Sequence, residues 1–109
     1  EAWKTMPHER QRLIDLIDTS SSDSVLFISG DRHRGGLYQL TSSSGKNIVE
    51  MTSSSLNLSF TNDEEAGPLR VGPTFVQENY GEILLNKLTN NLTVNLKDNQ
   101  GNIVQSVDL

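Results

Sequence analysis

The chain contains no cysteine among its 109 residues. Disulfide bridges, thiolate zinc sites and cysteine nucleophiles are therefore excluded, although this absence identifies no cellular compartment. Long apolar runs are also missing, because no stretch approaches the roughly 20 residues that a membrane-spanning helix requires. The first residues, Glu-Ala-Trp-Lys, contain no signal segment, so any targeting signal is expected to lie outside this sequence.

Basic residues are outnumbered by acidic ones. The sequence has 9 Lys and Arg against 14 Asp and Glu, which gives a net charge of -5. Because non-specific binding to nucleic acid or to an anionic membrane needs clustered Lys and Arg, we expect neither as a partner. Apolar residues make up only 34%, so polar loops must occupy much of the chain. The length suits one compact unit, and residues 1–109 are interpreted as a single domain or a fragment of one.

The first part of the chain predicts a helix followed by a strand. Pro7 suits a first helical turn, and residues 7–18 place four apolar side chains at helical spacing, namely Leu13, Ile14, Leu16 and Ile17. After a polar loop, residues 25–29 form a short apolar run, which is typical of a strand buried on both faces. A helix, a loop and a buried strand together resemble the second half of an α/β unit.

The rest of the chain predicts antiparallel strands. Residues 37–40 and 48–51 flank the turn sequence TSSSGKN as a hairpin, whereas residues 52–74 are polar and irregular. A closing meander of four strands is expected at residues 75–79, 82–87, 92–97 and 103–107. The expected fold class is therefore α+β, with one helix and a buried strand followed by a mostly antiparallel sheet.

The stretch SGDRHRGGLY, residues 29–38, carries the candidate chemistry. Asp31, Arg32 and His33 directly follow the predicted 25–29 strand, at the edge where open α/β sheets usually bind ligands. Aspartate and histidine are metal ligands, and arginine is well shaped to hold a phosphate. The neighbouring Gly30, Gly35 and Gly36 permit close backbone approach and unusual dihedral angles. The same residues also fit an ordinary polar turn, in which His33 caps local backbone.

Five segments occur in the order and spacing of one protein family: HERQRLIDLI, VLFISGDRH, LYQLTSSS, GPTFVQENYGEI and NIVQSVDL. Through them the chain resembles, over nearly its whole length, the C-terminal part of PhoD-type alkaline phosphatases, which are calcineurin-like metallophosphoesterases. The resemblance implies the second sheet half of a metallophosphoesterase β-sandwich. It also implies a periplasmic or extracellular metal-dependent hydrolase that acts on a phosphate ester.

The resemblance assigns roles to individual residues. His33 occupies the position of the last residue in a Gly-x-x-His element, where the family's histidine ligates one of two metals. Asp31 stands where many relatives have another histidine, and it is expected either to ligate the metal or to orient His33. Arg32 is expected to contact the substrate phosphate. Arg34 is a second candidate for that contact, although the following Gly35 and Gly36 depart from the family's pattern.

The family's other metal-binding elements lie upstream of this sequence. A two-metal mechanism requires both ions to be held roughly 3.5–4 Å apart, which one Asp and one His cannot achieve. The chain is therefore expected to supply one corner of a centre of Ca, Fe, Zn or Mn that is complete only in a longer parent. We expect no full metal occupancy and no activity in the chain itself. The alternative is a non-catalytic β-rich interaction or structural domain.

Five further expectations concern other parts of the sequence. His8 is expected to be exposed and without function, and the acidic run 63–65 to be solvated. Asn79 and Tyr80 either lie near the metal corner or form a strand end, with Tyr80 packed beneath the 30–34 loop. The meander could form a second sheet layer. Because neighbouring strands are missing, we expect another copy or the upstream part of the parent to cover the edge of the 25–29 strand, the alternative being a self-contained monomer.

Overall fold

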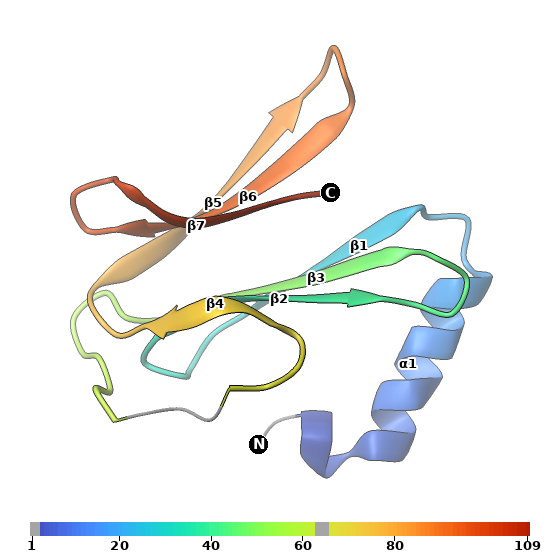
Figure 1. Ribbon diagram of the computed structural model, residues 1–109, viewed down its shortest axis with the longest axis horizontal. Coiled ribbons are helices and arrows are strands. Elements are labelled where there is room, and N and C mark those ends of the chain that lie inside the picture. Colours follow the sequence, from blue (N-terminus) through green and yellow to red (C-terminus); the bar gives the residue numbers. More distant parts are fainter. Residues whose placement is uncertain (1–2, 63–65) are drawn as a thin grey trace.

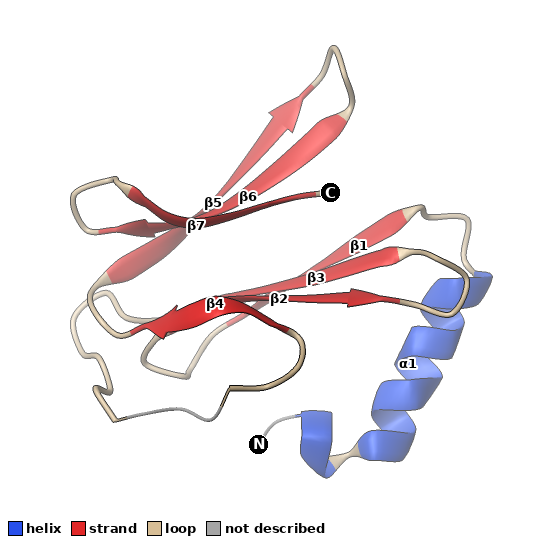
Figure 2. Cartoon of the chain, viewed as in Figure 1, coloured by secondary structure: helices blue, strands red, loops and turns tan. Residues whose placement is uncertain are grey.

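The computed structural model describes residues 3–62 and 66–109, which form an α+β fold with one α-helix and two mostly antiparallel sheets (Figure 2). None of the helices in these described residues is long and apolar enough to cross a membrane. The elements are η1 (Trp3–Thr5), α1 (Pro7–Thr19), β1 (Ser24–Ser29), β2 (Gly35–Thr41), β3 (Asn47–Ser53), β4 (Arg70–Phe75), β5 (Asn79–Asn86), β6 (Asn91–Asp98) and β7 (Ile103–Asp108).

The predicted helix is confirmed as α1, with Pro7 in its first turn. Its apolar stripe is narrower than expected, because Ile17 is buried while Leu16 remains 66% exposed. Leu13 and Ile14 are half-buried and face the four-stranded sheet. The helix therefore covers part of one face of that sheet and leaves a groove beside it.

The four-stranded sheet has the strand order β1-β3-β2-β4 (Figure 1). The hairpin of β2 and β3 is confirmed, and Gly45 turns it with a φ of 87°. β1 pairs with β3 in parallel and lies at the edge of the sheet. The expectation that residues 25–29 are buried on both faces is wrong, because an edge strand has fewer neighbours: Ile28 is 68% exposed.

The opposite edge strand, β4, lies in a region that the sequence predicted to be irregular. Its Gly72 and Pro73 resemble loop residues, but Pro is compatible with an edge strand, whose outward N–H groups need no partner within the sheet. β4 pairs with β2 through a register shift. The strand expected at residues 75–79 is not formed, because β4 ends at Phe75 and β5 begins only at Asn79.

The closing meander forms a separate three-stranded sheet with the order β5-β6-β7. It packs against the four-stranded sheet as a second layer, and a core of Leu37, Val49, Met51, Val94 and Val107 fills the space between the layers. β5 lies opposite β3, and the layers come close enough at Gly81 that a side chain there would collide with Met51. The sequence expectation of a second layer is therefore confirmed.

Candidate functional site

The Asp31–His33 loop connects β1 to β2, at the carboxyl end of β1 as predicted. Asp31 and His33 both have positive φ angles, 62° and 52°, which are uncommon for residues other than glycine. Ser54, just beyond β3, bridges two backbone groups of the loop through its side chain. Its hydroxyl accepts a hydrogen bond from the Arg32 N–H at 2.9 Å and donates one to the Arg34 carbonyl at 3.3 Å. The loop thus has a fixed, unusual backbone shape.

His33 is held on three sides and remains half-exposed. Its Nδ1 lies 3.0 Å from the Leu58 carbonyl oxygen, and its own carbonyl accepts a hydrogen bond from the Phe60 N–H at 2.8 Å. The imidazole stacks on the Phe60 ring with centroids 4.3 Å apart and planes 11° from parallel. Because a carbonyl oxygen can only accept, Nδ1 carries the hydrogen, and the lone pair of the neutral ring is on Nε2.

The two arginines of the loop have different surroundings. Arg32 is exposed, and its Nη1 donates to the Tyr38 hydroxyl at 3.3 Å. Arg34 is only 5% exposed and donates to the side-chain oxygen of Asn62 at 3.0 Å and to its carbonyl at 3.3 Å. Arg34 therefore fixes the segment around Asn62, and its burial gives no support to the suggested phosphate contact.

Asn79 anchors the same region from the second sheet. It is 2% exposed, its side-chain oxygen accepts from Ser53 at 2.9 Å, and its amide donates to the Gln77 carbonyl at 2.7 Å. Its backbone N–H donates to the Ser55 carbonyl. Tyr80 is 39% exposed, so the expectation that it packs beneath the loop is wrong. Side chains alternate along a strand, and in this strand the inward position belongs to Asn79.

The segment 52–60 supplies the contacts that the sequence did not indicate. It provides Ser54, the Leu58 carbonyl and Phe60, yet it showed only a polar, serine-rich composition. Within the described residues, three buried hydroxyls of this segment have no hydrogen-bond partner, those of Thr52, Ser55 and Ser59. Unpartnered buried polar groups cost about 1–3 kcal/mol each, so their concentration beside the loop requires an explanation.

The remaining candidates do not add to this cluster. His8 is exposed on α1, as expected. The acidic run 63–65 lies outside the described residues. Within residues 3–62 and 66–109, no three His, Asp or Glu side chains gather in a way that could hold a metal ion. Among the described residues, Asp31 and His33 are therefore not joined by a third such side chain.

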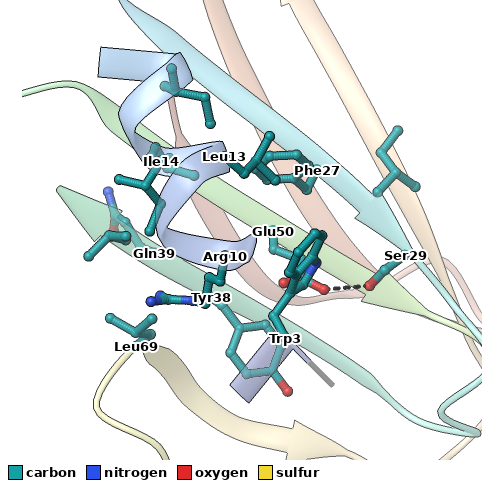
Figure 3. A pocket seen from close by; sticks show the side chains of 14 residues that line it. Trp3, Arg10, Leu13, Ile14, Phe27, Ser29, Tyr38, Gln39, Glu50 and Leu69 are labelled. Carbon is teal, nitrogen blue, oxygen red and sulfur yellow. Dashed lines mark hydrogen bonds between the residues drawn. The ribbon is translucent and has the colours of Figure 1, made fainter. Parts of the chain in front are cut away.

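An open groove lies away from the loop, between α1 and the outer face of the four-stranded sheet (Figure 3). It is lined mainly by apolar side chains of α1, β1, β2 and β3. Among its polar lining residues, the Ser29 hydroxyl donates a partly buried hydrogen bond of 2.7 Å to the Glu50 carboxylate. The groove contains none of the predicted site residues, and its form follows from the incomplete cover that α1 gives the sheet.

Comparisons of the chain with protein-family models, with curated proteins and with solved structures give no match.

Proposed function

We propose that this chain is the C-terminal portion of a metal-dependent phosphoric ester hydrolase of the PhoD-type alkaline phosphatase kind. In this proposal, the four- and three-stranded layers are one half of a metallophosphoesterase β-sandwich, and the Asp31–His33 loop is one corner of a two-metal site. The phosphate ester substrate and the periplasmic or extracellular location follow from the same resemblance. The proposed cofactor is a centre of Ca, Fe, Zn or Mn in the longer parent.

The orientation of His33 is the observation that carries the proposal. Metal-binding histidines usually donate one ring N–H to a carbonyl or carboxylate, which fixes the tautomer and directs the other nitrogen to the ion. His33 has this arrangement, with Nδ1 on the Leu58 carbonyl and the ring stacked on Phe60. Its Nε2 is therefore a pre-positioned donor with a fixed direction. A histidine that only caps backbone would share the contact with the Leu58 carbonyl, so the stack on Phe60 and the resulting fixed direction of Nε2 are what support the metal role.

The surroundings of His33 add two supporting observations. Strained backbone angles tend to concentrate at functional sites, and two of the three non-glycine residues with positive φ in the described chain are Asp31 and His33. The unpartnered hydroxyls of Thr52, Ser55 and Ser59 belong to the segment that supports the loop. A polar environment of this kind is suited to a bound ion and its water molecules.

The proposed roles follow from position and chemistry. His33 would hold one metal through Nε2, and Asp31 would bind the same ion or orient the imidazole. Arg32 is exposed beside them and would contact the substrate phosphate while its Nη1 keeps Tyr38 in place. The bound metals would activate water and stabilise the leaving oxygen, and their remaining ligands would have to come from the upstream part of the parent.

The proposal predicts that His33→Ala in the full-length parent abolishes metal-dependent hydrolysis of p-nitrophenyl phosphate. His8→Ala is the matched control, since His8 is exposed on α1 and should leave hydrolysis unchanged. Nitrogen-15 NMR of the 109-residue chain gives a second readout, in which neutral His33 should be the Nδ1–H tautomer. Full activity of the His33→Ala parent, or an Nε2–H tautomer at His33, would contradict the proposal.

The alternative function is a non-catalytic β-rich interaction or structural domain. One observation favours it: β1 and β5 are edge strands on the same flank, with exposed apolar side chains. In that case the parent's hydrolysis of p-nitrophenyl phosphate, if any, would be indifferent to His33. The experiment above therefore separates the two functions.

A further inference from the structure

The two sheets are staggered by one strand. Asn79, at the start of β5, bonds to Ser53 at the end of β3, and Gly81 contacts Met51 two residues earlier in β3. β5 therefore lies over β3, and β1, the edge neighbour of β3, lies beyond β5 on that flank. Ile28 confirms this, because it shares the inner face with its neighbour Met51 but is 68% exposed, whereas Met51 is 4% exposed.

The stagger creates a notch on one flank of the molecule. One wall of the notch is the inner face of β1, and the other is the open edge of β5. Ile83 and Leu85, which share the inner face of β5 with Asn79 and Gly81, are 40% and 55% exposed. β1 has no charged residue, and the one acid of β5, Glu82, is paired with Lys97 of its own sheet at 2.7 Å. The two strands that border the notch thus have exposed apolar side chains and no unpaired charge within them.

The opposite flank is protected. Its edge strands are β4, which contains Pro73, and β7, which has a register shift against β6. The Gln105 side chain also bonds across the layers to the Pro73 carbonyl. Proline, bulges and covering contacts are the usual devices that prevent edge strands from pairing with other chains. The β1/β5 flank shows none of these devices in the described residues.

We propose that the notch is filled by a second copy of this chain, with β1 of each copy inserted beside β5 of the other. The two copies are related by a two-fold axis. This axis runs parallel to the strands and lies between the two layers, level with β1. Each layer then has seven strands, in the order β4-β2-β3-β1 from one copy followed by β5-β6-β7 from the other. Within each copy β5 stays opposite β3, so the dimer can form without moving any strand of either copy.

Strand direction and charge fit this arrangement. β5 runs opposite to β3, because its first residue lies at the end of β3, and β1 is parallel to β3. The new pair of β1 and β5 is therefore antiparallel, and the two Ile28 side chains face each other across layers that are about 10 Å apart. At the start of β1, the exposed Asp23 of one copy comes close to the exposed Lys87 of the other.

Other pairings of two copies fit less well. If two β5 edges paired, the β1 of one copy would occupy the position of β3 in the other. If β7 paired with β5, the β4 that lies opposite β7 would collide with β1. If two β1 edges paired, a gap of two strands would remain in the second layer. Only the reciprocal insertion closes both edges and covers Ile28.

Light scattering of the 109-residue chain after size exclusion should give twice the mass of one chain. Ile28→Lys introduces two facing charges between the layers, so it should raise the dissociation constant of the dimer at least about tenfold. At concentrations where the original chain is dimeric, the variant should be a folded monomer. Ile103→Lys is the matched control: Ile103 is 58% exposed on β7, in the protected flank, and its replacement should leave the dimer intact. Circular dichroism checks that each variant is folded.

Two further variants make the arrangement specific. Asp23→Lys should weaken the dimer, and the reversed pair Asp23→Lys with Lys87→Asp should restore it. Because the chain contains no cysteine, Ile28→Cys gives a single thiol, and a short bis-maleimide should join two copies through it, whereas Ile103→Cys should not react in this way. A monomer at all concentrations, or a dimer that Ile103→Lys breaks and Ile28→Lys does not, would overturn the inference. No step of the inference involves His33, so its failure would leave the His33→Ala test of the proposed function unchanged.

Discussion

Gly35 occupies the point where the His33 loop, the core and the second sheet meet. A β-carbon placed there would lie 2.7 Å from the Leu96 side chain and 2.8 Å from the side-chain oxygen of Asn79. Leu96 is fully buried, and Asn79 is fixed by its hydrogen bonds to Ser53 and Gln77. Neither side chain can move away easily, so glycine is required here for close approach rather than for an unusual φ.

We therefore predict that Gly35→Ala destabilises the fold by about 1–3 kcal/mol, the usual cost of an extra methyl group in a packed core. The adjacent Gly36→Ala is the control, because the new β-carbon would make only ordinary contacts of 3.4–3.6 Å. Gly36→Ala should be neutral or stabilising by up to about 1 kcal/mol, since alanine restricts the unfolded chain. Urea unfolding measures both, and equal effects of the two substitutions would show that the close approach is not limiting.

At the scale of elements, α1 is fastened to the β2–β3 hairpin at its C-terminal end. The Lys46 ammonium donates to the carbonyl of Ile17, which also accepts the Ser20 N–H, and to the carbonyl of Ser20 just beyond the helix. Asp18 in turn accepts hydrogen bonds from the hydroxyls of Ser43 at 2.6 Å and Ser44 at 2.7 Å. The helix has no basic residue in its last turn, so the hairpin provides the cap.

This contact predicts a dependence of stability on pH. The hydroxyls of Ser42, Ser43 and Ser44 lower the pKa of Asp18 to about 2, from the ordinary 3.8. Because the folded pKa is the lower one, the contribution of Asp18 is fully present above about pH 4 and is lost as the pH falls through about 2. Asp18→Asn should therefore reduce the free energy of unfolding at pH 6 and have progressively less effect between pH 4 and pH 2.

A double-mutant cycle isolates this contribution. In a Ser43→Ala, Ser44→Ala background, two of the three hydroxyl donors to Asp18 are absent and Ser42 remains, so the pH-dependent part of the Asp18→Asn effect should become smaller without vanishing. Thermal or urea unfolding at pH 2, 4 and 6 supplies the values. A pH-dependent Asp18→Asn effect of the same size in both backgrounds would assign the contribution to other partners of the carboxylate.

At the scale of the whole molecule, the ligand set of the proposed site is incomplete. Asp31 and His33 are two donors, and no third His, Asp or Glu of the described chain joins them in a metal-binding group. We predict that the purified 109-residue chain shows no hydrolysis of p-nitrophenyl phosphate with Mn, Zn, Ca or Fe added. Sustained turnover that survives further purification would contradict the proposal that this chain supplies only one corner of a two-metal site. If His33→Ala then abolished that turnover, the complete active site would have to lie within this chain.

The sequence predicted where the candidate site lies in the fold, but it did not predict the backbone conformation of the loop or the contacts that orient His33. Asp31, Arg32 and His33 follow an apolar run, so their place at the end of β1 could be inferred from the sequence. The unusual dihedral angles were expected at the glycines of the loop, yet Asp31 and His33 adopt them. The Leu58 carbonyl and Phe60, which orient His33, lie more than 20 residues away in the sequence, and no local pattern connects them with the loop.

The sequence by itself determined most elements, because helix and strand patterns are local properties of side-chain spacing. Pro7 and the apolar stripe defined α1, and the strands predicted at residues 82–87, 92–97 and 103–107 correspond to β5, β6 and β7, although β5 already begins at Asn79. β4 was missed because Gly72 and Pro73 are tolerated only at a sheet edge, and edge position is a property of the assembled sheet. The same holds for β1: its apolar run predicted burial on both faces, but the stagger between the layers decided that Ile28 is exposed.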